Sequence, residues 1–226
     1  MVLTTFESRR NYTAEEILWL RHLGHDSPHC SHVTQFVGTL PAGSNLGEGL
    51  GMALPPLVDG NLPLGRWPAT VDEIENTYVL GLSDKRQQIW RDWLELTTAL
   101  RDALTTVPAA WLSGSFFTDK SEPGDIDSVY LIEWSILWAA RTDAPRAQFL
   151  EVVAASQVKD LFGLNVDSYI LEWVPSSGPE TASWARQYLE NRGYWDDLWS
   201  RSRSSDARLD AIPRRGYLEV ILDGYC

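Results

Sequence analysis

The most constraining stretch of this sequence is residues 111–133, where two apolar runs are separated by a short polar segment. The first run ends on Gly114 and Ser115, and the second begins at Asp125 and Asp127. Residues two apart in a strand point to the same side of a sheet, so these two carboxylates are expected to lie together. They repel each other and lose hydration unless a cation holds them. The pattern therefore predicts two strands that carry a charged site.

Hydrophobic periodicity predicts the elements around this stretch. Ile89, Trp93, Leu96 and Leu100 recur at helical spacing, which predicts a long helix that begins at Ser83. Thr70 and Glu73 have the spacing of a capping box at the start of a shorter helix. In full, helices are expected over 13–25, 71–79, 83–104, 144–163 and 179–203, the last broken or kinked at Gly193, and strands over 109–114, 126–134, 165–173 and 217–222.

The order of these elements sets the expected fold class. Helix, strand, strand, helix, strand, helix and strand follow one another from residue 83, which is typical of an α+β or mixed-sheet α/β domain. Residues 25–69 carry many Pro and Gly and are expected to be extended and irregular. A chain of 226 residues is long enough for one domain with appendages.

Composition narrows the class of protein. A net charge of -12 argues against a broad basic surface for nucleic acid, although it leaves a local basic patch open. Cys30 and Cys226 do not form a disulfide framework, which favours the cytoplasm. The N-terminus lacks the apolar stretch of a signal peptide. The longest apolar segment, 128–140, contains Glu133 and falls short of the roughly 20 residues of a membrane helix. We therefore expect a cytoplasmic protein with no membrane partner.

The Gly-Ser bend and the carboxylate pair together resemble the signature of the nucleotidyltransferase superfamily. In that signature an Asp-x-Asp strand follows a Gly-Ser turn after a loop of similar length, and here nine residues separate Ser115 from Asp125. The resemblance implies a polymerase-beta-like fold, in which a small mixed sheet is flanked by helices. It also implies a nucleoside triphosphate, such as ATP, as substrate, with Asp125 and Asp127 binding Mg²⁺ as a pair of ions. Gly114 would let the backbone approach a phosphate, to which Ser115 would donate hydrogen bonds.

Further residues complete the expected site. The superfamily carries a third carboxylate on a neighbouring strand, and Asp167, near the start of the strand over 165–173, fits that place. It would bind metal or act as a general base, whereas Glu172 lies near the other end of the strand. Lys120, in the loop, and Lys159, just before that strand, are candidates for phosphate binding. The alternatives are a solvated loop lysine and a helix-surface lysine.

The resemblance extends along most of the chain. Similarity to one family of small bacterial proteins with this minimal core is carried by residues 52–75, the long helix, residues 114–127 and residues 216–222. It covers residues 52–224 and implies a nucleotidyltransferase-like domain over 52–226, preceded by an N-terminal extension over 1–51 that contains a short helix.

The implied activity is transfer of a nucleoside monophosphate from a triphosphate to a hydroxyl acceptor, with release of pyrophosphate. RNA 3′ ends such as that of tRNA, proteins and small molecules are all candidate acceptors. Many minimal nucleotidyltransferases act as toxins or in phage defence, so a cognate antitoxin is a further expected partner. One alternative is a catalytically silent module of this fold that serves in a toxin–antitoxin pair. In another, Pro123, Gly124 and Asp125 merely form the turn of a polar hairpin.

Two other clusters are candidates for binding. Imidazole and thiolate ligands for Zn²⁺, with a structural or regulatory role, are offered by His22, His25, His29, His32 and Cys30, and a third hypothesis is accordingly a metal-sensing protein. Cationic groups that could grip an RNA backbone are offered by Arg201, Arg203, Arg208, Arg214 and Arg215. Asp206 and Asp210 dilute this second cluster, which favours a solvated loop.

Overall fold

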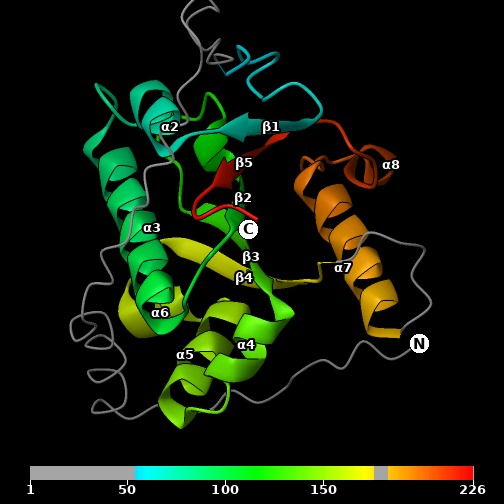
Figure 1. Ribbon diagram of the computed structural model, residues 1–226. Coiled ribbons are helices and arrows are strands. Elements are labelled where there is room, and N and C mark those ends of the chain that lie inside the picture. The colour runs from blue at the N-terminus through cyan, green and yellow to red at the C-terminus, as the bar shows by residue number, and fades with distance from the viewer. Residues whose placement is uncertain (1–53, 176–182, 226) are drawn as a thin grey trace, which may run out of the picture.

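The computed structural model describes residues 54–175 and 183–225. The helix expected over 13–25 and the cluster of histidines with Cys30 lie outside these residues. The described residues form a mixed α+β structure around a single five-stranded sheet, as the order of elements predicted (Figure 1).

The sheet contains both parallel and antiparallel pairs. Its spatial order is β1-β5-β2-β3-β4, with β2 antiparallel to both β5 and β3, and with the pairs β1–β5 and β3–β4 parallel. The strands are β1 (Arg66–Ala69), β2 (Ala109–Ser113), β3 (Ile126–Glu133), β4 (Val166–Trp173) and β5 (Tyr217–Ile221).

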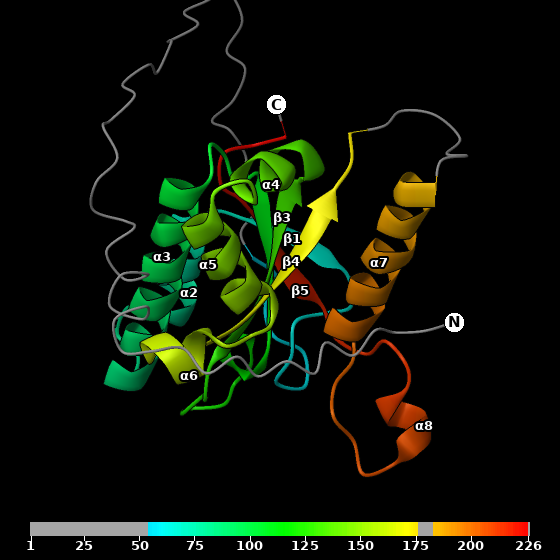
Figure 2. The same cartoon turned by 90° about the horizontal axis from the view of Figure 1, so that it is seen from below.

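Helices cover both faces of the sheet. The helices are α2 (Val71–Tyr78), α3 (Asp84–Ala103), α4 (Trp134–Ala140), α5 (Ala144–Ala154), α6 (Val158–Phe162), α7 (Ser183–Trp199) and α8 (Ala207–Asp210), and a 3₁₀ turn, η1, spans Ser115–Phe117. Helices α2, α3, α5 and α6 lie on one side of the sheet and α7 lies on the other (Figure 2).

Alternation along β3 and β4 decides which side chains face α7. In β3, Tyr130 and Ile132 belong to the core under α3 and α5, whereas Val129 and Leu131 pack with Trp199 at the end of α7. Odd-numbered residues of β3 therefore point toward α7. Tyr169 and Leu171 of β4 belong to the same cluster as Trp199, so odd-numbered residues of β4 point the same way.

Local sequence explains the two helices that lead into β2. Thr70 and Glu73 form the predicted capping box at α2, with Glu73 N–H donating to the Thr70 hydroxyl over 3.1 Å. The Ser83 side chain caps α3 by accepting from the N–H of Arg86, which confirms the predicted start of the long helix. One side of α3 is buried against the sheet, where Trp93 donates to the Ser128 hydroxyl on β3 at 3.2 Å.

Four sequence expectations were wrong in detail. The helix expected over 144–163 is two helices, because Ser156 has a left-handed φ of 54° that a right-handed helix cannot continue. The strand expected over 126–134 ends at Glu133, and α4, a helix that the sequence analysis did not predict, begins at Trp134. Helix α7 passes through Gly193 without a break. Part of the segment expected to be irregular forms β1, which pairs with β5.

Among the described residues, no helix combines the length and the apolar composition that a bilayer-spanning helix requires.

Candidate functional site

Two of the three predicted carboxylates, those of Asp127 and Asp167, lie on the α7 side of the sheet. Asp127 on β3 and Asp167 on β4 are direct partners in the parallel register, and both are odd-numbered residues that point toward α7. Asp125 precedes the first residue of β3 by one position, so it joins the pair from the loop rather than from the strand itself. Glu172 pairs in register with Ile132 at the far end of β4 and forms an ion pair with Arg141.

The close approach of these acids changes their proton affinity. Burial, together with the negative charges of Asp125 and Asp167, raises the pKa of Asp127 from 3.8 to about 6. Burial and Asp125 likewise raise the pKa of Asp167. The cations that oppose these shifts differ: Arg215 and Arg203 act on Asp127, whereas Lys159 acts on Asp167. The carboxylates of Asp125, Asp127 and Asp167, the acidic group of this site, therefore have arginines on one side and a lysine on the other.

Gly114 is required because the Asp127 side chain lies against it. Its φ is +95°, a conformation that residues with a side chain rarely adopt. A Cβ atom placed there would lie 2.2 Å from Oδ2 of Asp127, closer than any non-bonded contact. The sequence analysis expected this glycine to admit a phosphate. The structure adds that it makes room for the carboxylate.

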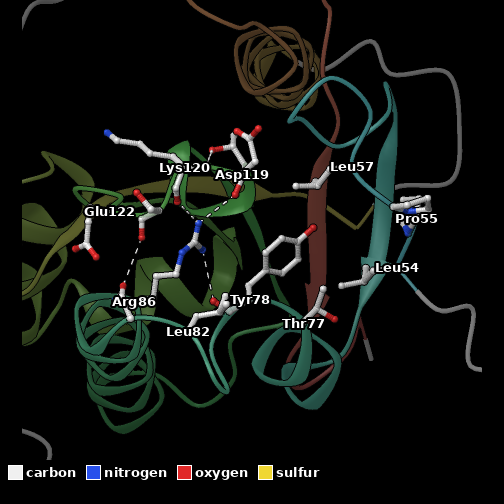
Figure 3. Close-up of a pocket in the computed structure, with 14 residues that line it drawn as sticks. Leu54, Pro55, Leu57, Thr77, Tyr78, Leu82, Arg86, Asp119, Lys120 and Glu122 are labelled. Carbon is white, nitrogen blue, oxygen red and sulfur yellow. Dashed lines mark hydrogen bonds between the residues drawn. The ribbon is translucent and has the colours of Figure 1, made fainter.

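Two arginines hold the loop that begins at Gly114. Nη1 of Arg215 donates to the Gly114 carbonyl at 3.3 Å and Nη2 donates to the Ser113 hydroxyl at 3.0 Å. Arg86, buried at the start of α3, donates to the carbonyls of Phe116 (2.7 Å), Thr118 (3.0 Å) and Lys120. Figure 3 shows Arg86 with the residues that line the adjacent cavity. Alternate carbonyls of this loop thus point at guanidinium groups.

This clamp occupies the carbonyl oxygens of the bend. Those of Gly114, Phe116, Thr118 and Lys120 accept hydrogen bonds from Arg86 or Arg215. The Ser115 hydroxyl, half-buried, has no hydrogen-bond partner within the part of the chain that the structure describes. A hydroxyl with free hydrogen-bonding capacity beside a left-handed glycine is suited to an oxyanion such as phosphate.

The two candidate lysines lie in different places. Lys159 on α6 forms an ion pair with Asp125, with 2.9 Å between Nζ and Oδ2. Lys120 lines a separate cavity of about 440 Å³ together with Arg86, Tyr78 and Leu54 (Figure 3). The structure therefore brings Lys159, but not Lys120, to the carboxylates.

Asp92 on α3 supports the start of β4. One of its carboxylate oxygens accepts from the backbone N–H of Asn165 at 2.9 Å and from the Asn165 side chain at 2.7 Å. Gln88 donates to the other oxygen at 2.7 Å. Because Asn165 immediately precedes β4, these bonds fix the strand that carries Asp167. In the sequence, Asp92 is a helix residue with Gln88 four positions before it, and this spacing does not predict the hydrogen bonds to Asn165.

The arginines near the C-terminus are the part of the site that sequence analysis misjudged. A solvated loop was favoured, but Arg201, Arg203 and Arg215 line one cavity of about 360 Å³ with Asp127. Arg208 and Arg214 are exposed and do not line it. Arg215 stands just before β5, which runs antiparallel to β2, so its position beside the end of β2 follows from strand pairing. The pairing was not predictable from spacing.

The acidic group fits Mg²⁺ by donor type. Three neighbouring carboxylates, of which Asp125 and Asp167 raise the pKa of Asp127, favour a hard divalent cation, for which oxygen is the preferred ligand. Within residues 54–175 and 183–225, however, no set of three or more His, Cys, Asp or Glu side chains stands ready as a metal site. Asp125 instead pairs with Lys159, so binding would require that ion pair to open.

The fold and the site define a mixed α+β protein with an acidic centre on the α7 side of its sheet, flanked by arginines and a lysine. The chain belongs to DUF6932, a family of unknown function, whose profile matches residues 56–221. Every residue of the site described above lies within that match. No curated protein and no solved structure matches the chain.

Proposed function

We propose that this protein is a metal-dependent nucleotidyltransferase with a polymerase-beta-like arrangement of its sheet. The observation that carries the proposal is the pairing of Asp127 with Asp167 across adjacent strands, on one face, beside the Gly114 bend. A packed core does not require two register-paired carboxylates, because each raises the energy of the other. A reaction that transfers a nucleotidyl group would use both carboxylates to bind divalent ions.

The roles follow from position. Asp125, Asp127 and Asp167 would hold divalent ions, which when bound supply positive charge to the triphosphate and to the attacking oxygen. Ser115 would donate to a phosphate oxygen. The acceptor hydroxyl oxygen bonds to the α-phosphorus, the bond between the α- and β-phosphates breaks, and pyrophosphate leaves. Asp167 would accept the hydroxyl proton as a general base.

Labelled nucleotide transfer tests this proposal. Each of the four triphosphates, with Mg²⁺ or Mn²⁺, is offered together with RNA, protein and small-molecule hydroxyl acceptors, and both label incorporation and pyrophosphate are measured. Wild-type protein is expected to release pyrophosphate, and Asp127→Asn to release none. Glu172→Gln is the matched control, because it removes a carboxylate from the other end of β4. Equal behaviour of wild type and Asp127→Asn on every acceptor would remove the proposal's support.

The ion pair of Lys159 with Asp125 favours a second function, that of a catalytically silent binding module of the same fold. An ammonium group there already neutralises part of the acidic group, as a metal ion would. In that case nucleotide binding persists without turnover, and Mn²⁺ gives no increase in melting temperature. A Mn²⁺-dependent increase that Asp127→Asn abolishes would exclude the silent module.

A further inference from the structure

The cavity beside Asp127 has a predominantly cationic wall. It lies between the sheet and the end of α7, where its charged lining comprises Arg201, Arg203, Arg215, Asp127 and Asp210. Tyr169 and Trp199, whose rings are 5.9 Å apart, form its apolar side. Its volume of about 360 Å³ falls within the range of small-ligand sites. An otherwise acidic protein therefore concentrates positive charge at one place.

The three arginines are not equally engaged. Arg215 is committed to Ser113 and Gly114, and Arg201 pairs with Asp197 one helical turn earlier. Arg203 is exposed and forms no hydrogen bond or ion pair with any residue in the described ranges. Its guanidinium group therefore remains available to a ligand, with five N–H donors.

The wall also holds positive charge that the protein does not fully compensate. The Nε atoms of Arg201 and Arg215 are buried and have no acceptor among the described residues. Burial lowers the pKa of Arg215, which reports the cost of keeping its charge away from water. An anion in the cavity would offset that cost electrostatically, even where it touches only Arg203.

We infer that this cavity binds a polyphosphate chain, and that it holds the β- and γ-phosphates of the nucleoside triphosphate donor, with Arg203 as the contacting cation. This inference rests on the proposed function. Arg215 joins the cavity to the bend, because one guanidinium group lines the first and binds the Gly114 carbonyl of the second. Lys159 stands on the Asp125 side of the acids. The leaving pyrophosphate therefore lies toward α7, and the acceptor approaches past Lys159.

Calorimetric titration of the full chain with sodium tripolyphosphate tests the inference, in EDTA and in Mg²⁺. Arg203→Ala is expected to weaken binding about tenfold in both, since a hydrogen bond to a charged group contributes that much, and Arg203→Lys is expected to weaken it less. Arg208→Ala is the matched control, because Arg208 is exposed in the same segment but does not line the cavity. Inorganic phosphate is expected to bind more weakly than tripolyphosphate. Thermal unfolding of each variant verifies that the fold is unchanged.

Several results would overturn the inference. Absence of tripolyphosphate binding by the wild type would do so, and so would equal weakening in Arg203→Ala and Arg208→Ala, which indicates a diffuse charge effect. Tighter binding of a single-stranded oligonucleotide than of tripolyphosphate would assign the cavity to the acceptor instead.

The two proposals fail separately. Nucleotide transfer that depends on Asp127 but shows no change in the KM for the triphosphate in Arg203→Ala would retain the enzyme and reject the cavity's role. Tripolyphosphate binding that depends on Arg203, without transfer to any acceptor, would retain the site and reject the enzyme.

Discussion

Replacement of Asp127 by Asn should stabilise the metal-free protein at neutral pH while removing its response to metal. Asp127 is largely buried against Gly114 and faces Asp167 in register. Its charge is therefore unfavourable in the folded state unless a cation is bound. Asparagine has nearly the same shape and carries no charge.

The pKa of Asp127 sets the magnitude. Folding raises this pKa from 3.8 to about 6, so the folded protein binds more protons than the unfolded chain between those values. The stability that this protonation contributes is complete below pH 3.8 and is lost as the pH rises through 6. At about 1.36 kcal/mol per pKa unit, the loss is about 3 kcal/mol. The Asp127→Asn variant should not lose this stability as the pH rises.

Urea unfolding in EDTA between about pH 4 and pH 8 measures the effect. The free energy of unfolding of Asp127→Asn, relative to wild type, should rise by about 3 kcal/mol across this interval. Asp102→Asn, which removes a carboxylate at the far end of α3, should run parallel to wild type. A pH-independent difference between Asp127→Asn and wild type would refute the electrostatic reasoning.

Three other perturbations follow from the same geometry. Gly114→Ala should destabilise the fold by about 1–3 kcal/mol through its left-handed backbone and its clash with the neighbouring carboxylate; Gly124→Ala, which meets nothing within 4 Å, should be near neutral in the same urea assay. Arg86→Ala should cost about 2–4 kcal/mol, because the loop carbonyls lose their buried donor, whereas the exposed Arg91→Ala should cost little; comparable losses would contradict the clamp. Lys159→Met should increase the rise in melting temperature that Mn²⁺ produces, since it frees Asp125; an unchanged or smaller rise would show that the ion pair does not compete with metal.

The fold was predictable where one segment carries its own pattern. The apolar stripe of α3 and the Ser83 cap fixed that helix, and the Thr70 capping box fixed the start of α2. The wrong predictions concern segments whose structure the local sequence pattern does not decide. Ser156 ends α5 by a backbone conformation that its residue type does not require, and β1 is recognisable as a strand only through its pairing with β5.

The candidate site, too, was predictable only in part. Strand spacing alone paired Asp125 with Asp127, and the resemblance to nucleotidyltransferases added Gly114, Ser115 and Asp167 to the predicted site. It also placed Lys120 in the site, whereas its side chain lines the Arg86 cavity.

The sequence by itself determined most of the helices and strands, among them the two strands that carry the acidic group, since helix stripes, caps and strand alternation are local properties that a chain carries before it folds. Only the tertiary structure decided which cations meet that group. Arg215 reaches Gly114 because β5 pairs with β2, across a separation of 101 positions, and Lys159 reaches Asp125 because α6 packs beside β4. Charge contacts of this kind depend on strand order, which is set by how all the apolar faces bury one another together.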